Sequence, residues 1–445
     1  MLLQFSVSNY RCFRTLQTLN LQASGQDKSL PDNVIERKLP GVDGKRWLKG
    51  VALYGANASG KSTLLDALRA FQQLVQQSAQ RTDPKEPIPQ VEPFELCPGQ
   101  PEVPTAFAVA FVTQGVRYEY RVAATRERIW HESLRAFPKT KEQLWFHREW
   151  SPDTGSYAWS PERPSGFKRD PQLESYTLPN VLFLSKAIAS NRPDLEPVFR
   201  FFTDQLVFRD LSGGRDFAPD FTLRHVAERT AMYPRIVELL RHADLGVLDA
   251  RAVEGSFSPD FEHAAKLIAL SSSQRATLEQ LRKKLPRQPE LTHRGSAGEV
   301  ALPWSVESAG TQRFFALAGP WLDILRNGST VCIDELETSL HPLMLRALLE
   351  LMFSASENPN GAQILFTTHN PLLLDATLLR RDQVWFTDKD EHGAAHLYPL
   401  TDYQPRKGES LVRGYLSGRY GAVPFLPEGL LGTFAMPPAK AKPHA

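Results

Sequence analysis

Hydrophobic positions along the chain follow helical and strand-like periods in turn. Residues 51–54 form a short apolar run, which is typical of a buried strand. After a glycine-containing loop, apolar residues return at helical spacing, at Leu64, Leu68, Phe71 and Val75. A second series is predicted further along: helix 312–326, strand 329–333, helix 342–354 and strand 362–368. Alternation of this kind is typical of an α/β fold.

Strand-like alternation dominates the first 150 residues. Residues 2–7 are predicted to form an edge strand, and residues 14–21 a second strand after a turn. Gln114-Gly115 lies between two strand-like runs and predicts a hairpin. The strand-like runs of this part cover 105–113, 117–123, 129–137 and 143–149.

The middle of the chain, residues 190–285, is expected to be mainly helical. One helix face is marked by Ile236, Leu239, Leu240 and Ala243. A later helical stretch is indicated by Ala265, Ile268, Leu278, Leu281 and Leu285. Because no heptad pattern is sustained, a long coiled-coil arm is not expected. Residues 291–304 return to strand-like alternation.

Composition narrows the class of protein without choosing among functions. A chain of 445 residues is long enough for two or three domains, and 42% hydrophobic with 23% charged residues is ordinary for a globular protein. The net charge of +2 neither predicts nor excludes nucleic acid as a partner. The three cysteines show no metal-binding spacing. No apolar run is long enough for a membrane span and the first residues do not resemble a signal peptide, so we expect a cytoplasmic protein.

A glycine-rich loop joins the strand at 51–54 to its helix. Gly55, Gly60, Lys61 and Ser62 fit the phosphate-loop pattern G-x-x-x-x-G-K-[ST]. Lys61 is expected to reach the β- and γ-phosphates of ATP, and Ser62 to bind Mg²⁺. The alternative, a chance glycine-rich turn, does not account for the flanking strand and helix. The predicted nucleotide-binding residues are Gly55, Ala56, Asn57, Ala58, Ser59, Gly60, Lys61, Ser62 and Thr63.

Two later strands end in residues that suit the chemistry of nucleotide hydrolysis. The strand at 329–333 runs into Asp334, which can hold Mg²⁺, and Glu335, which can polarise an attacking water. The strand at 362–368 ends on His369, which can hydrogen-bond the γ-phosphate. The catalytic candidates are therefore Glu335, His369 and Lys61, and the metal candidates are Ser62 and Asp334. The alternatives are a solvated acidic turn and a structural histidine.

A second anion site is predicted where Ser308 and Gly310 open the helix that leads to the Asp334 strand. One chain cannot easily use two such sites on one γ-phosphate. Two chains arranged head to tail can, with Ser308 of one facing Lys61 of the other. The pattern therefore favours a homodimer or a higher homo-oligomer. The alternative is a plain capped helix.

Together these motifs resemble the ABC-type ATPases of the SMC, RecF and overcoming-lysogenization-defect group. Residues 55–62 look like their Walker A motif, residues 308–312 like their signature, and Asp334-Glu335 like their Walker B motif with its catalytic glutamate. Residues 337–341 are similar to their D-loop, and His369 to their switch histidine.

The resemblance extends to the first residues of the chain. Residues 9–13 are similar to the segment with which this group contacts nucleotide, which implies such a contact for Arg11. The Q-loop glutamine of the group stays open among Gln90, Gln100 and Gln114.

More narrowly, the chain resembles the stand-alone AAA-family ATPases of bacterial abortive-infection operons, with RloA/AbiL-like proteins the nearest. Besides the motifs above, the runs at 182–185 and 418–424 support this resemblance. Such ATPases commonly work with a separately encoded nuclease or toxin, which implies an operon-encoded effector here. The acidic cluster at 388–391 is predicted to be a hairpin turn and not a nuclease metal site.

The resemblance implies an α/β protein with an ABC-ATPase-like P-loop fold, a mixed β-sheet and an inserted, mainly helical arm domain. Residues 1–150 would form the N-terminal half of the ATPase head, with the Walker A lobe and a β subdomain. Residues 151–295 would form the inserted arm, and 296–400 the C-terminal half of the head. Residues 401–445 would form a C-terminal extension and tail.

Three functions fit these features. The first is an ATP-hydrolysing switch in anti-phage defence, and the second is a RecF- or SMC-like DNA-repair ATPase. The third is a nucleotide-bound scaffold that sequesters a toxin, against which an intact Glu335 argues. Nucleic acid is a further candidate partner, because basic residues gather in one segment. They are Arg275, Arg282, Lys283, Lys284, Arg287 and Arg294.

Overall fold

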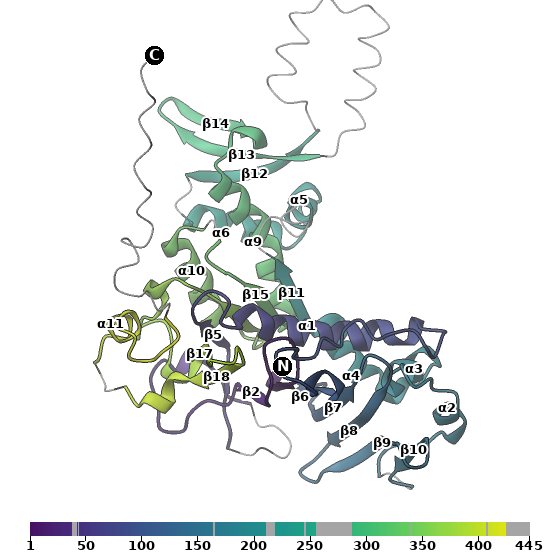
Figure 1. Ribbon diagram of the computed structural model, residues 1–445. Helices are drawn as coiled ribbons and strands as arrows, with labels where there is room; N and C mark the ends of the chain where they lie inside the picture. The colour runs from purple at the N-terminus through teal and green to yellow at the C-terminus, as the bar shows by residue number, and fades with distance from the viewer. Residues whose placement is uncertain are drawn as a thin grey trace, which may run out of the picture.

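The computed structural model describes residues 1–37, 42, 44–162, 165–210, 219–243, 246–254, 287–338, 340–405 and 408–423. Within these residues, two large sheets and the helices between and around them make up most of the fold (Figure 1). The helical stretch predicted at 265–285 lies outside the described residues.

The central sheet has six strands in the order β11-β15-β16-β5-β17-β18. All neighbouring strands are parallel except the last pair, which is an antiparallel hairpin. The sheet is therefore mixed, as predicted. Its strands are β5 (Gly50–Tyr54), β11 (Leu206–Asp210), β15 (Thr330–Asp334), β16 (Gln363–Thr367), β17 (Val384–Lys389) and β18 (Ala395–Pro399).

The second sheet is antiparallel and has the order β10-β9-β8-β7-β6-β1-β2. The hairpin predicted at Gln114-Gly115 joins β6 to β7 and is confirmed. The expectation that residues 2–7 form an edge strand is wrong, because β1 pairs with β2 on one side and β6 on the other. The strands are β1 (Leu2–Ser8), β2 (Gln17–Asn20), β6 (Thr105–Thr113), β7 (Val116–Ala124), β8 (Ile129–Phe137), β9 (Gln143–Ser151) and β10 (Ser156–Ser160).

Helix α1 (Lys61–Gln77) lies between the two sheets. Its Phe71 stacks on Phe107 of β6 and Tyr120 of β7, with ring centroids 5.3 and 5.6 Å apart. The same core includes Val51 and Leu53 of β5. The helix is thus covered on both sides, which holds its first turn firmly at the end of β5.

The other face of the central sheet is covered by α9 (Ala309–Asn327) and α10 (Pro342–Phe353). Both helices, and the strands β15 and β16 between which α10 runs, lie within a few residues of the predicted bounds. Ala52 and Tyr54 of β5 belong to this second core, whereas Val51 and Leu53 belong to the first. Strand β5 is therefore buried on both faces, which explains why it is apolar without alternation.

The segment 151–295 contains helices, as predicted, but also strands. Strand β11 lies in the central sheet beside β15, so this segment is not separate from that sheet. Strands β12 (Val247–Val253), β13 (Gln288–Gly295) and β14 (Gly298–Pro303) form a small antiparallel sheet at the top of Figure 1. The helices are α2 (Pro171–Ser175), α3 (Phe183–Ala189), α4 (Glu196–Arg200), α5 (Asp220–Ala227) and α6 (Tyr233–His242).

The run at 182–185 begins α3. Glu132 of β8 accepts hydrogen bonds from the amides of Phe183 (2.7 Å) and Leu184 (3.0 Å), so it caps the start of this helix. The Ser185 hydroxyl donates to the Val75 carbonyl of α1 at 2.6 Å. Helix α3 thereby joins the second sheet to α1. The remaining short elements are β3 (Val34–Ile35), β4 (Trp47–Leu48) and α11 (Leu411–Leu416).

Candidate nucleotide site

The glycine-rich loop connects β5 to α1, which confirms the predicted strand, loop and helix. Gly55 has no room for a side chain, since a Cβ there would lie 2.4 Å from Ser59 Oγ and 2.5 Å from the Thr387 carbonyl oxygen. Gly60 precedes the helix with a φ of 113°, a conformation that favours glycine. The hydroxyls of Ser59 and Thr387 lie 2.6 Å apart, so β17 holds the loop from the other side.

Lys61 turns back onto this loop. Its Nζ donates to the carbonyl oxygens of Gly55 and Ala56, both at 2.9 Å. Burial lowers the pKa of Lys61, whereas the nearby carboxylates of Asp334, Glu335 and Glu337 act to raise it. A phosphate would be a stronger partner for this ammonium than two neutral carbonyls, because it adds the attraction between two opposite full charges.

Ser62 and Asp334 meet at the start of α1. The Ser62 hydroxyl donates to Asp334 Oδ1 at 3.0 Å, and the Thr367 hydroxyl donates to the same oxygen at 2.6 Å. Hydroxyl and carboxylate oxygens are the hard ligands that Mg²⁺ prefers, so this pair fits the predicted metal site. Thr367 was not predicted from the sequence. The feature that could have identified it is its position at the carboxyl end of β16, the strand next to β15.

Glu335 follows Asp334 with an exposed side chain and a φ of 49°. This left-handed conformation is uncommon for a residue other than glycine. The Glu335 amide donates to the Thr367 hydroxyl at 2.8 Å, which holds the turn in place. The side chain is thus directed out of the sheet edge, where a water molecule can reach it.

His369 lies just beyond the end of β16 and is exposed. Its amide donates to Glu337 Oε1 at 2.5 Å, a contact that the sequence did not reveal. Because β15, β16 and β5 are parallel neighbours, their carboxyl ends bring Asp334, His369 and the phosphate loop to one edge. The structure therefore gathers the predicted catalytic and metal residues in one place.

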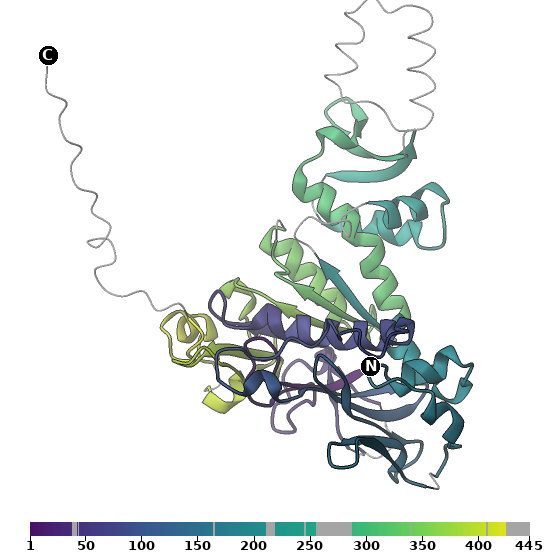
Figure 2. The same ribbon diagram turned by 45° about the vertical axis from the view of Figure 1, so that its right-hand side comes forward.

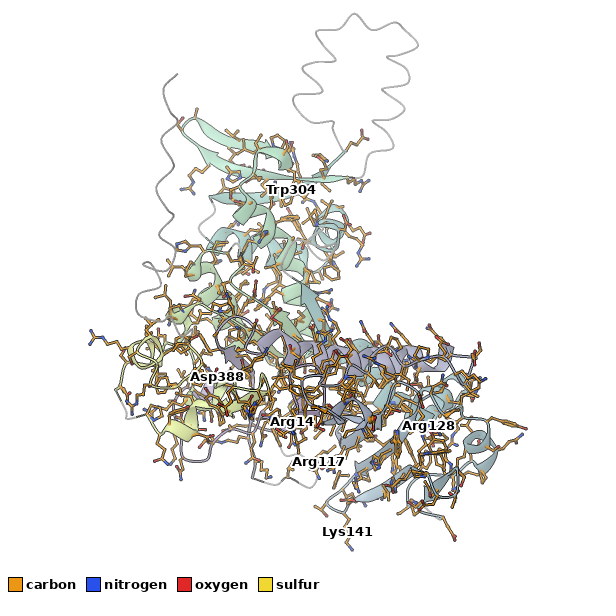
Figure 3. All side chains as sticks on the ribbon, viewed as in Figure 1. Arg14, Arg117, Arg128, Lys141, Trp304 and Asp388 are labelled. Atoms are coloured by element: carbon orange, nitrogen blue, oxygen red, sulfur yellow. The ribbon has the colours of Figure 1, made fainter. Side chains whose placement is uncertain are left out.

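Ser308 and Gly310 open α9 as predicted. They do not lie at the phosphate loop of the same chain. Ser308 is the N-cap of α9, and its hydroxyl accepts the Thr311 amide at 3.1 Å. The preceding Trp304 lies at the small sheet of β12, β13 and β14, away from α1 (Figure 3). Figure 2, turned from the first view, shows the same separation between the start of α9 and α1. In the described part of the chain, no hydrogen bond joins Ser308 or Gly310 to residues 55–63.

Arg11 binds two carboxylates in this structure. Its guanidinium donates to Glu92 at 2.9 and 3.0 Å and to Asp66 at 2.6 Å. The hydrogen bond to Glu92 raises its pKa. The neighbouring Cys12 touches the phosphate loop, since a Cβ on Gly60 would lie 3.1 Å from its Sγ. Arg11 is thus near the loop, and its contact with nucleotide stays a prediction.

The remaining predictions fall outside this edge of the sheet. The acidic cluster at 388–391 lies at the turn between the antiparallel strands β17 and β18, which confirms the hairpin. No group of three His, Cys, Asp or Glu that could hold a metal is found in the residues that the structure describes. Gln90, a Q-loop candidate, is buried and accepts a hydrogen bond from Arg81 at 2.8 Å. In the basic segment, Arg275, Arg282, Lys283 and Lys284 lie outside the described residues.

A phosphate loop after a central parallel strand, with two acids at the end of a nearby strand, defines an ATPase domain of the P-loop class with an ABC-like mixed α/β fold. The chain belongs to the family described as "AAA domain, putative AbiEii toxin, Type IV TA system", whose model matches residues 51–375. No curated protein has a significant match to the sequence.

Two solved SMC head structures are similar at a low level. The SMC head domain from Thermotoga maritima is 13% identical, with a TM-score of 0.39 over 89% of this chain and 98% of that chain. An SmcHead bound to the C-winged helix domain of ScpA is 12% identical, with a TM-score of 0.41 over 89% of this chain and 96% of that chain. Of the helices in the described part, none has both the length and the apolar character to cross a bilayer.

Replacing Thr367 with valine should weaken Mg²⁺-dependent ATP binding about ten- to a hundredfold, because a hydrogen bond to a charged group contributes about 1.5–3 kcal/mol. The affinity for ATP in EDTA should stay the same, since Thr367 contacts Asp334 and not the phosphate loop. Titration of a fluorescent ATP analogue with and without Mg²⁺ measures both affinities.

Thr330→Val is the matched control. Thr330 is also buried and hydrogen-bonded, but it lies at the start of β15, whereas Asp334 lies at its end. An equal loss of Mg²⁺-dependent affinity in both variants would show that Thr367 acts only through stability.

Proposed function

We propose that the chain binds ATP with Mg²⁺ and hydrolyses it, acting as a nucleotide-gated switch. The observation that carries this proposal is the hydrogen bond of 3.0 Å between Ser62 Oγ and Asp334 Oδ1. It joins the phosphate loop to the acidic strand, so that a nucleotide and its metal ion have ligands from both. Mg²⁺ bound there would neutralise charge on the phosphates.

The other residues at this edge have separate roles in the proposal. The loop amides and Lys61 bind the phosphates, with Lys61 leaving its two carbonyl partners for a phosphate oxygen. Glu335 accepts a proton from the attacking water, and His369 orients that water and the γ-phosphate. Arg11 reaches nucleotide only after exchanging Glu92 or Asp66 for it.

Lys61→Ala and Glu335→Gln should fail in different ways. Lys61→Ala removes a phosphate contact and should weaken ATP binding. Glu335→Gln should bind ATP normally but hydrolyse it about 10²–10⁴-fold more slowly, which is the range for a positioned acid–base group. ATP binding and phosphate release measure the two steps.

Glu391→Gln, in the exposed β17–β18 turn, is the control and should behave as the unmodified protein. Normal turnover by Glu335→Gln would contradict the role proposed for Glu335.

The proposed switch is a head-to-tail pair of chains. Ser308 is exposed at the start of α9, and this end of the helix lies away from α1 of the same chain (Figure 1), so the helix N-terminus is available to a second copy. Large apolar side chains are also exposed beside three of the motifs. They are Val306 (56% exposed) before Ser308, Leu343 (70%) after the D-loop-like stretch and Leu372 (63%) after His369. Exposed apolar groups at these positions favour an interface between copies.

ATP should increase self-association of Glu335→Gln, because the bound nucleotide persists and bridges two chains. Adding Ser308→Arg should abolish this gain by placing bulk and charge at the seam. Light scattering measures the association, and Lys141→Ala, in the exposed turn between β8 and β9 of the second sheet, is a control away from the start of α9.

For a constitutive oligomer, cross-linking between positions near Lys61 and near Ser308 replaces light scattering. Cross-linking yields that do not change with ATP would contradict a nucleotide-closed pair.

The biological role that we propose is anti-phage defence with a separately encoded effector. The family description refers to a toxin of a toxin–antitoxin system, which supports a role in such operons. The described residues contain no cluster of acids or histidines suited to a nuclease metal centre, so the proposal places the effector on another chain.

The chain should protect cells from phage only together with its operon neighbour. Cells would carry the chain alone, the neighbour alone or both, and would be challenged with a phage panel. Lys61→Ala should abolish protection, because closure needs bound nucleotide.

Because the proposed effector is a separate chain, the purified protein should not cut DNA or RNA with Mg²⁺ or Mn²⁺. Nuclease activity that persists in the pure chain and is lost in Asp388→Ala would contradict a separate effector.

A further inference from the structure

The backbone of the switch-histidine segment is held from two sides by residues that have no role so far. On one side is Glu337, three residues after Asp334. Glu337 Oε1 accepts the His369 amide at 2.5 Å. Its other oxygen, Oε2, is buried and has no hydrogen-bond partner among the described residues. A buried carboxylate oxygen without a partner costs stability, so its retention needs a reason beyond packing.

On the other side is Tyr54, the last residue of β5 before the phosphate loop. Its side chain is fully buried, and its hydroxyl donates to the Asn370 carbonyl oxygen at 3.2 Å. The two-residue segment His369-Asn370 is thus held at the amide of His369 and at the carbonyl of Asn370. The first contact comes from the segment that follows the strand of Asp334, and the second from the strand of the phosphate loop.

Tyr54 is itself positioned by the C-terminal part of the described chain. Its ring packs edge-on against Tyr415 of α11, with centroids 5.5 Å apart. Tyr415 and Tyr420 both stack on Phe386 of β17, at 5.9 and 5.7 Å. Gly414 fits beneath Tyr420 only because it has no side chain, since a Cβ there would lie 2.5 Å from the Tyr420 hydroxyl.

We propose that Glu337 and Tyr54 are positioning residues that set the place of His369, and that the aromatic cluster of α11 holds Tyr54 for this purpose. This inference rests on the proposed function, because it is the hydrolysis of ATP that His369 would serve. Tyr420, in the run at 418–424, stacks on Phe386, whose ring in turn lies 6.3 Å from that of Tyr54. A change in the C-terminal segment would be transmitted to His369 through Tyr415 and Tyr54.

The position of His369 can be tested without any hydrolysis. Protein labelled with ¹⁵N-histidine gives one amide signal per histidine, and His369→Ala identifies that of His369. Glu337→Ala should shift this signal upfield and speed its hydrogen exchange at least tenfold, because a short hydrogen bond is lost. Glu337→Gln should largely preserve it, since an amide oxygen also accepts. An unchanged signal in Glu337→Ala would overturn the proposal for Glu337.

Tyr54→Phe keeps the ring and removes only the hydroxyl. The His369 amide signal should therefore move in this variant and stay in place in Tyr157→Phe. Tyr157 is the matched control, since its hydroxyl also donates to a backbone carbonyl, that of Ile129, at 2.7 Å, but in the other sheet. The same His369 signal in Tyr54→Phe and in the unmodified protein would overturn the proposal for Tyr54.

Steady-state kinetics then show whether Tyr54 acts on the reaction through His369. Tyr54→Phe should lower kcat about tenfold with KM within about twofold, which is the size expected for one lost hydrogen bond in the reacting state. In a His369→Ala background the same change should cause no further loss, because its only route to the reaction is gone.

Losses that multiply in the double variant would overturn the proposed route. Absence of ATP hydrolysis in the unmodified protein would contradict the proposed function instead, and the amide signals would still decide where His369 is held.

Discussion

The hydrogen-bonded contact of Ser62, Asp334 and Thr367 is the interaction on which the rest of the site depends. One carboxylate oxygen, Asp334 Oδ1, accepts hydrogen bonds from both hydroxyls. The three residues come from the start of α1, the end of β15 and the end of β16. A nucleotide site needs its phosphate ligands and its metal ligands at one place, and the residues proposed for the two sets meet at this contact.

The two cores of the molecule keep that contact in place. Strand β5 gives Val51 and Leu53 to the core shared with α1 and the second sheet, and Ala52 and Tyr54 to the core under α9 and α10. A shift of β5 would therefore disturb both cores at once, which is costly in a close-packed interior. At the edge of the sheet, by contrast, the proposed function needs side chains that solvent and nucleotide can reach, and Glu335 and His369 are exposed there.

Local patterns in the sequence predict much of this site, whereas pairing between distant segments is not visible in them. The loop at 55–62, the acids Asp334 and Glu335 and the helix of Ser308 follow from spacing and from short-range periodicity. The place of β1 inside its sheet does not, because its partner β6 is about a hundred residues away and local periodicity does not show which distant strand pairs with it. The roles of Thr367, Glu337 and Tyr54 also depend on strand order, since each contacts a residue of another segment.

The most direct test of the shared site is a double-mutant cycle on ATP affinity with Ser62→Ala and Asp334→Asn. Isothermal titration calorimetry would give the affinities of the unmodified protein, both single variants and the double variant, with Mg²⁺ and with EDTA. If the two side chains hold one ion, their losses in Mg²⁺ should be non-additive by about 1 kcal/mol or more, and this coupling should fall sharply in EDTA. Additive losses in Mg²⁺ would contradict the account, because they would mean that Ser62 and Asp334 act on the nucleotide independently.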